Sequence, residues 1–195
     1  MSMTALLLQT KDPLLSNPKM RQALAHAIDY EQLAAAVTEG LAKPNNSIVP
    51  LVSPYHDATQ KEGWKYDVAL SQKLLKEAGY KGQEIELMTT KRYPQSYNSA
   101  VIIQAMLQAA GINAKLSVAE WATQLDRYNA GTYQMMTFPY SARLDAALNY
   151  EMVTGEKSKQ PRKVWDNPEA QKLLDAASVD TDPVSYTHLR AHETR

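Results

Sequence analysis

Few side chains in this sequence of 195 residues suit acid–base chemistry. There are four histidines and no cysteine, so neither a thiolate nucleophile nor a disulfide is available. His26 stands between two alanines in a helical pattern, where a packed or solvated helix residue is the ordinary interpretation. His56 lies in a proline-rich stretch that favours a solvated loop, although with Tyr55 and Asp57 it could form a binding surface. The sequence lacks G-x-G-x-x-G, phosphate-loop, G-x-S-x-G and H-E-x-x-H patterns, so none of these mechanisms is indicated.

The other two histidines have the spacing of metal ligands. His188 and His192 are four residues apart, as on one face of a helix. However, residues 184–195 show neither helical nor strand periodicity, and they resemble a reading frame through a transposase-type sequencing adapter. We therefore expect this tail to be an artefact outside the fold, the alternative being an ordinary polar C-terminal tail. No metal site and no cofactor are predicted.

Glu84 and Glu86 form a pair of carboxylates on one face of a predicted strand. They flank Ile85 in the manner of a solvent-facing side. We interpret them as solubilising residues and not as a catalytic acid and base.

The charge balance argues against two classes of partner. Twenty-one Lys and Arg residues are matched by 21 Asp and Glu residues, which provides no basic surface for nucleic acid and no polybasic attraction to anionic lipid. The longest apolar stretches, residues 5–8 and 100–103, are far shorter than the roughly 20 residues of a transmembrane helix. The start of the sequence shows no signal-peptide pattern.

Helices are expected to dominate the first part of the chain. Apolar residues at helical spacing predict helices over residues 18–28, 29–40 and 67–78, the first two capped by Asn17 and Asp29. The proline-rich stretch over residues 43–54 predicts an extended linker, because each proline disfavours helix at the residue before it.

Strand and helix patterns alternate from residue 84 onward. Strands are predicted over 84–89, 113–119 and 133–138, and helices over 95–110 and 121–130. In the second strand, Ala114, Leu116 and Val118 are expected to face inward. This order is typical of right-handed βαβ crossovers, so we predict an α/β fold with a parallel or mixed sheet and flanking helices. A last helix is predicted to begin at residues 166–169.

Five ordered motifs carry a resemblance to a known family. Residues 21–29 match an R-Q-A-L-x-x-A-I-D core, residues 39–44 a glycine-then-proline exit, residues 66–80 a Y-D-P-x-x-A-x-x-L-L-x-E-A-G-Y segment, and residues 104–112 an L-x-x-x-G-I segment. Glu120-Trp121, followed by Gly131-x-Tyr133, completes the series. Over residues 4–183 the chain thus resembles the extracellular solute-binding proteins of ABC importers, family 5, the dipeptide/oligopeptide-binding family. Val68 departs from it where proline is usual.

The resemblance implies a periplasmic-binding-protein-like type II fold, whose two lobes close over a ligand and deliver it to permease subunits in the membrane. The motifs belong to the second lobe. We therefore expect residues 1–15 to form a hinge-proximal strand and linker, and residues 16–183 to form a second-lobe α/β domain that is truncated at its C-terminus. The absence of a signal peptide then indicates truncation. At full length, the resemblance implies a periplasmic or lipid-anchored cell-surface monomer that binds peptides or peptide-like solutes without catalysis.

The resemblance also suggests how a peptide would be held. In the family, an aspartate of a D-P motif shortly after a glycine–aromatic strand binds the α-ammonium of the ligand. Asp145 occupies that place here, although Ala146 replaces the proline and Arg143 stands where an acidic or polar residue is common. The alternative for Asp145 is a helix cap, with Arg143 as its exposed partner.

Four further residues are candidates for contact with a ligand. Arg92 and Tyr93 follow a strand, where ligand sites of α/β proteins form, and they could receive a carboxylate and stack on the ligand. Trp121 and Tyr140 could line the cleft, although aromatic residues more often belong to the core.

Two other functions remain open from the sequence. One is an intracellular α/β enzyme domain that uses His26 or His56 as a base. The other is a receptor or sensor derived from the same fold. A pocket with a nucleophile or metal ligand beside either histidine would favour the enzyme, and histidines on outer surfaces would argue against it.

Overall fold

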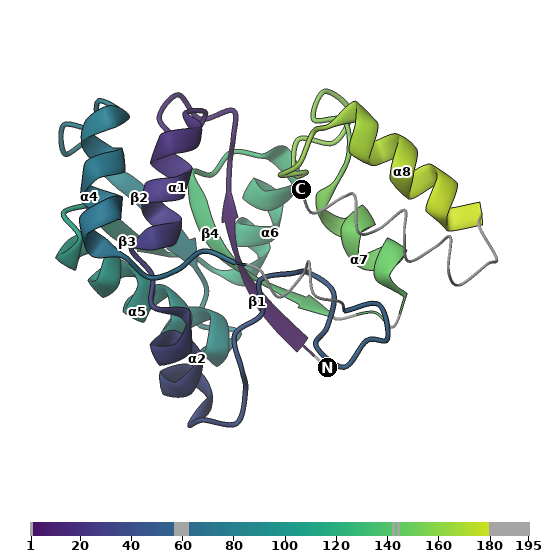
Figure 1. Ribbon diagram of the computed structural model, residues 1–195, viewed down its shortest axis with the longest axis horizontal. Helices are drawn as coiled ribbons and strands as arrows, with labels where there is room; N and C mark the ends of the chain where they lie inside the picture. Colours follow the sequence, from purple (N-terminus) through teal and green to yellow (C-terminus); the bar gives the residue numbers. More distant parts are fainter. Residues whose placement is uncertain (1, 57–62, 142, 144, 180–195) are drawn as a thin grey trace. The chain divides into compact units, whose positions relative to one another are not determined.

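The computed structural model describes residues 2–56, 63–141, 143 and 145–179. They form two compact units (Figure 1), which we call the sheet unit, Ser2–Pro44 with Trp64–Tyr140, and the helical unit, Asn45–Gly63 with the described residues from Ser141 onward. The tail over residues 184–195, with His188 and His192, lies outside the described residues. The artefactual tail and the single domain over residues 16–183 stay predictions.

The sheet unit is built on four strands in the order β1-β4-β2-β3. They are β1 (Ser2–Leu8), β2 (Ile85–Thr89), β3 (Ala114–Val118) and β4 (Met135–Ser141). Strand β2 is parallel to both neighbours, since Leu87 pairs with Leu116 on one side and with Met135 on the other. Strand β1 runs the opposite way, because the N–H of Gln9, just after β1, donates to the carbonyl of Gln134, just before β4, at 2.9 Å. The predicted α/β fold with a mixed sheet is confirmed.

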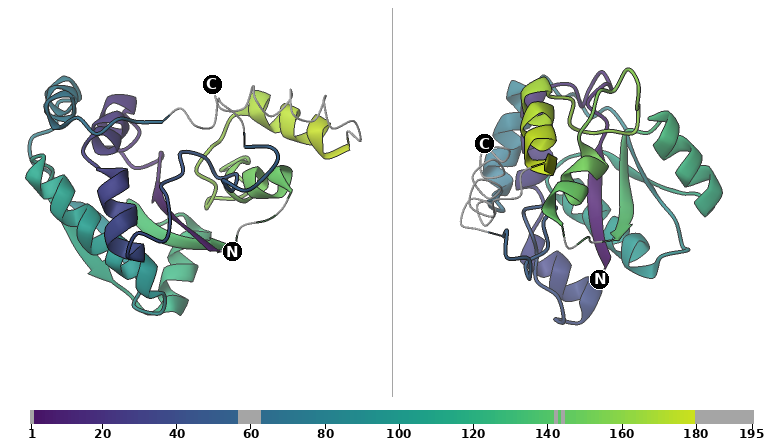
Figure 2. Two further views of the ribbon diagram at one scale, coloured as in Figure 1. Left: turned by 60° about the horizontal axis from the view of Figure 1, so that its bottom comes forward. Right: turned by 90° about the vertical axis from the view of Figure 1, so that its right-hand side faces the viewer.

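Five helices accompany the sheet: α1 (Pro18–His26), α2 (Tyr30–Thr38), α4 (Val68–Glu77), α5 (Pro94–Ala109) and α6 (Trp121–Ala130). Their paths can be followed in Figures 1 and 2. The side chains of Asn17, Asp29 and Asp67 each accept a backbone N–H from the first turn of α1, α2 and α4. The backbone N–H groups of a helix's first turn have no partner within the helix. The caps therefore explain where the helices begin. No helix among the described residues is long and apolar enough to span a membrane.

The two faces of the sheet pack against different helices. Alternate strand residues point to opposite faces, and Ile85 and Leu87 lie in the main core with residues of α1 and α5. Glu86 therefore points to the other face, where both its carboxylate oxygens accept hydrogen bonds from Arg127 of α6 at 2.9 and 2.6 Å. On β4, Phe138 stacks with Tyr128 of α6 at 4.2 Å between ring centroids. Helix α6 thus covers the second face.

The helical unit contains α7 (Ala146–Val153) and α8 (Pro168–Val179). Its core joins Ala146 and Tyr150 of α7 to Leu174 of α8 and to Val49. The predicted linker over residues 43–54 is irregular, as expected, but Val49 in it is fully buried. Helix α7 is an element that the sequence pattern did not predict, apart from the alternative of Asp145 as a helix cap.

Three local expectations were wrong. Strand β4 does not end at Phe138 but continues through Pro139 to Ser141. Proline is tolerated there because the pairing of β4 with β2 involves Met135 and Met136, several residues earlier. Val118 shares the face of Ala114 and Leu116 but is not buried there, since it ends the edge strand β3 and is 46% exposed. Glu86 is not simply a solvated side chain, because α6 covers it.

The pair of Glu86 and Arg127 predicts a pH-dependent contribution to stability. The hydrogen bond from Arg127 holds the pKa of Glu86 below its usual value, against the opposing effect of burial. The pair therefore stabilises the fold above the unfolded-state pKa of glutamate, about 4.3, and the contribution is lost as pH falls through the lowered folded-state pKa. We expect Glu86→Gln to reduce the free energy of unfolding by about 1–2 kcal/mol at pH 7.

Urea denaturation of the wild type and of Glu86→Gln at several pH values measures this difference. The difference in free energy of unfolding between the two proteins should become smaller as the pH falls below about 4. The control is Glu84→Gln, whose side chain is 55% exposed beside Lys115 and should contribute little. A difference that does not change with pH would contradict the role of this ion pair.

Candidate functional site

Aromatic side chains gather at the edge of the sheet where three neighbouring strands end. Strands β2, β3 and β4 are parallel, so their carboxyl ends share one edge. In α/β proteins this edge is the usual place for a ligand site. Five aromatic residues contact one another in a chain that runs inward from this edge, which we call the edge cluster: Tyr93, Trp121, Tyr128, Phe138 and Tyr140.

The edge cluster is continuous from an exposed rim to a buried base. Tyr93 packs edge-on against Trp121 with 4.9 Å between ring centroids, and Trp121 lies 5.5 Å from Phe138. Phe138 is in turn 5.1 Å from Tyr140, whose hydroxyl lies 3.1 Å from that of Tyr128. Tyr93 is 37% exposed, whereas Tyr128, Phe138 and Tyr140 are buried. The face of the cluster that can meet a ligand is therefore that of Tyr93 and Trp121.

Local sequence explains how each ring reaches this place. Tyr93 directly precedes Pro94, which occupies the first position of α5 after the turn that follows β2. Trp121 opens α6 and lies seven residues before Tyr128, so both lie on the helix face that covers the sheet. Phe138 and Tyr140 are two positions apart and therefore share one face of β4.

Two cations accompany the exposed rim of the cluster. Lys91 and Arg92 are exposed in the turn between β2 and α5. The ammonium of Lys91 lies 5.6 Å from the centre of the Tyr97 ring, within the range of a cation–π contact. Sequence reasoning identified Arg92 but missed Lys91, although its place two residues after β2 was a sufficient signal. The aromatic faces can stack on a ligand, and the neighbouring cations can attract its carboxylate.

Asp145 and Arg143 belong to the helical unit. The carboxylate of Asp145 accepts the N–H of Ala147 at 2.6 Å and caps α7. The buried Asn149 holds this loop, because its amide donates to the carbonyls of Arg143 and Asp145 at 2.8 and 2.9 Å and accepts the N–H of Arg143 at 3.0 Å. The alternative of Asp145 as a helix cap is therefore confirmed, and both side chains are exposed.

The structure thus brings some of the predicted site residues together. Tyr93, Trp121 and Tyr140 share the edge cluster, and Arg92 directly precedes Tyr93. Arg143 and Asp145 lie in the other unit, so their membership of a common ligand site stays a prediction. Sequence reasoning missed Phe138 and Tyr128, which connect the cluster.

The two described histidines have ordinary structural partners. His26 places Nδ1 2.7 Å from the carbonyl of Lys65 and packs edge-on against Trp64. His56 places Nε2 3.1 Å from the amide oxygen of Asn45. Within the described part of the chain, no group of three or more His, Asp or Glu residues could hold a metal ion. These contacts give no support to either histidine as a catalytic base.

Comparison with known proteins identifies the family. The model for bacterial extracellular solute-binding proteins, family 5 (middle part), matches residues 1–161. The chain belongs to this family. It is 27% identical over 189 residues to the oligopeptide-binding protein OppA of Bacillus subtilis, covering 90% of this chain and 34% of the relative. It is 35% identical over 126 residues to the dipeptide-binding protein of Escherichia coli, covering 62% of this chain and 23% of the relative.

Solved structures show the same fold. HbpA2 from Haemophilus parasuis matches 99% of this chain with a TM-score of 0.89 and 25% identity, over 39% of its own chain. The dipeptide-binding protein from Pseudoalteromonas sp. SM9913, in complex with Met-Leu, matches 99% of this chain with a TM-score of 0.86 and 25% identity, over 40% of its own chain. The chain therefore spans about a third or less of the curated relatives above.

The cap at Asp145 predicts how two substitutions will differ. Asp145→Ala removes the acceptor for the first turn of α7 and should lower the free energy of unfolding by about 1 kcal/mol. Asp145→Asn should change it by much less, because asparagine caps helices as well as aspartate does. Thermal or urea denaturation measures both effects. Asp126→Ala, at an exposed position inside α6, is the control. Equal losses for Ala and Asn would mean that the charge of Asp145, and not its cap, stabilises the fold.

Proposed function

We propose that this chain is part of the substrate-binding component of an ABC importer, and that the whole protein binds peptides or peptide-like solutes for transport. The observation that carries the proposal is the edge cluster with its cations, in a chain that belongs to a family of solute-binding proteins. The relatives named for oligopeptide and dipeptide binding, and the solved structure that holds Met-Leu, support the same class of solute.

The chemistry of the candidate residues suits this class. Peptides of variable sequence share an α-ammonium, a carboxylate and a backbone, and a general binding site must hold these groups. Arg92 would attract the carboxylate, and the rings of Tyr93 and Trp121 would pack against the peptide. The buried Tyr140 would support these rings from within the edge cluster. Asp145 would hold the ammonium, with Arg143 beside it on the same loop. In this arrangement the cap interaction of Asp145 also fixes the carboxylate that the ligand meets.

The remaining features of the proposal concern the whole protein. It would act without catalysis and without a cofactor, in the periplasm or anchored by lipid at the cell surface. It would be a monomer that delivers its ligand to permease subunits in the membrane. Residues 1–15 would form the hinge-proximal strand and linker, and the α/β part from residue 16 would belong to the second lobe.

The role of the edge cluster can be tested in the full-length protein by titration calorimetry with Met-Leu and with a tripeptide. We expect saturable binding, weakened at least about tenfold in Trp121→Ala, because a stacked aromatic contact that excludes water is lost. The matched control is Trp64→Ala, since Trp64 is 51% exposed beside His26. Unchanged affinity in Trp121→Ala, or equal losses in both variants, would contradict the assignment.

The role of Asp145 can be separated from its cap. Asp145→Asn keeps the cap but removes the negative charge. We expect it to weaken binding of a peptide with a free ammonium roughly tenfold or more, and to leave an N-acetylated peptide almost unaffected. Calorimetry with both peptides on the wild type and on the variant measures the difference. Retained affinity for the free peptide would exclude Asp145 as the ammonium partner.

A further inference from the structure

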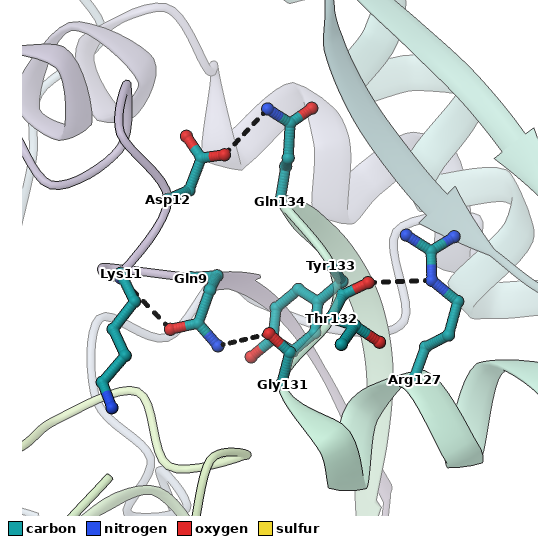
Figure 3. A pocket seen from close by; sticks show the side chains of 8 residues that line it. All are labelled: Gln9, Lys11, Asp12, Arg127, Gly131, Thr132, Tyr133 and Gln134. Atoms are coloured by element: carbon teal, nitrogen blue, oxygen red, sulfur yellow. Dashed lines mark hydrogen bonds between the residues drawn. The ribbon is translucent and has the colours of Figure 1, made fainter. Parts of the chain in front are cut away.

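A pocket of about 280 Å³ lies in the sheet unit, at the opposite ends of the strands from the edge cluster. It is lined by Gln9, Lys11 and Asp12, which follow β1, by residues 131–134, which lead into β4, and by Arg127 of α6. Figure 3 shows these side chains around the pocket. The edge cluster forms where β4 ends, whereas this pocket forms where β4 begins. The two are therefore separate sites of one unit.

The hydrogen-bond acceptors of this pocket are largely occupied by protein donors. Asp12 accepts the N–H groups of Leu14 and Leu15 at 2.9 and 3.0 Å with one oxygen, and the amide of Gln134 at 3.0 Å with the other. The carbonyl of Gly131 accepts the amide of Gln9 at 3.1 Å (Figure 3). An incoming group that donates hydrogen bonds would have to compete with these contacts.

Tyr133 and Lys11 each carry a donor in the same pocket that has no such partner. The hydroxyl of Tyr133 is buried, on a residue that is only 4% exposed, and it has no hydrogen-bond partner among the described residues. Burial raises the pKa of Tyr133, so the hydroxyl keeps its proton at neutral pH. Lys11 is exposed, and none of the ion pairs within 4 Å among the described residues involves it. A buried polar group without a partner is costly, which favours a ligand that supplies one.

The charges that line the pocket also favour an anion. Lys11 and Arg127 are positive, and Asp12 is the negative residue of the lining. Arg127 is already held by Glu86 and by the carbonyl of Thr132, to which its Nε donates at 2.9 Å. Asp12 is likewise engaged by three donors. The charge that remains available to a ligand is therefore the ammonium of Lys11.

We propose that this pocket is a second binding site, which takes a carboxylate group through the hydroxyl of Tyr133 and the ammonium of Lys11. A carboxylate accepts hydrogen bonds through both oxygens and donates none, so it matches the unpaired donors and does not compete with the occupied acceptors. The carboxylate could come from a small free acid or from an acidic side chain of a partner protein. The site is independent of the proposed peptide site.

The probes are succinate, its neutral analogue succinamide, and N-acetyl-glutamate amide, each titrated by calorimetry into the full-length protein at low ionic strength. We expect saturable binding of at least one of the two carboxylates and none of succinamide. Binding of succinate alone indicates a free acid, and binding of the capped glutamate indicates an acidic side chain. Failure of both carboxylates to bind, or equal binding of succinamide, overturns the proposal.

Two variants test the assigned residues, with controls of the same type. Lys11→Gln and Tyr133→Phe should each weaken carboxylate binding roughly tenfold, whereas Lys81→Gln and Tyr66→Phe, at exposed positions elsewhere in the unit, should not. Peptide affinity should be unchanged in all four variants, so the outcome does not depend on the proposed function. Unchanged carboxylate affinity in both pocket variants would overturn the assignment.

A stability measurement separates binding from a structural role of Tyr133. If its hydroxyl lacks a partner in the free protein, Tyr133→Phe should leave the melting temperature of the ligand-free protein unchanged or raise it. The rise in melting temperature on adding the bound carboxylate should become smaller in the variant. A lower melting temperature without ligand would show that the hydroxyl is bonded within the protein, and would overturn the proposal.

Discussion

The parallel pairing of β2 with both of its neighbours determines where the functional side chains of the sheet unit gather. Leu87 pairs with Leu116 and with Met135, so β3, β2 and β4 run together and end at one edge. The turns after these strands then carry Tyr93 and Trp121 to the same place. Because the strand starts meet at the opposite edge, the same pairing also separates the aromatic edge cluster from the polar pocket.

Much of this architecture could be predicted because its signals are local. Asn17, Asp29 and Asp67 cap helices that begin within a residue or two of the predicted positions, since a cap depends only on the residues of its own first turn. The predicted helix over residues 121–130 has the bounds that α6 shows. The α/β fold follows from the order of these elements, which the family resemblance supports independently.

Features that depend on contacts distant in sequence could not be predicted in the same way. The residues around Glu86 alternate as on a solvent-facing side of a strand. However, Arg127, 41 residues later, hydrogen-bonds to Glu86 from α6. The strand predicted over residues 133–138 continues past Pro139, because the pairing of β4 with β2 involves Met135 and Met136. The candidate site shows the same division: position after a strand identified Arg92 and Tyr93, whereas the link through Phe138 and Tyr128 required the packing of α6 on β4.

We propose that the carboxyl edge of the sheet forms the ligand face of the whole protein. Hydrogen–deuterium exchange of the full-length protein, with and without Met-Leu, locates this face, because exchange reports the protection of each backbone segment. We expect the ligand to slow exchange in residues 90–93, 119–121 and 139–141. Exchange around residues 9–12 and 131–134, at the opposite edge, should stay unchanged. Protection at the opposite edge, with unchanged exchange in the three segments of the carboxyl edge, would exclude this position of the ligand face.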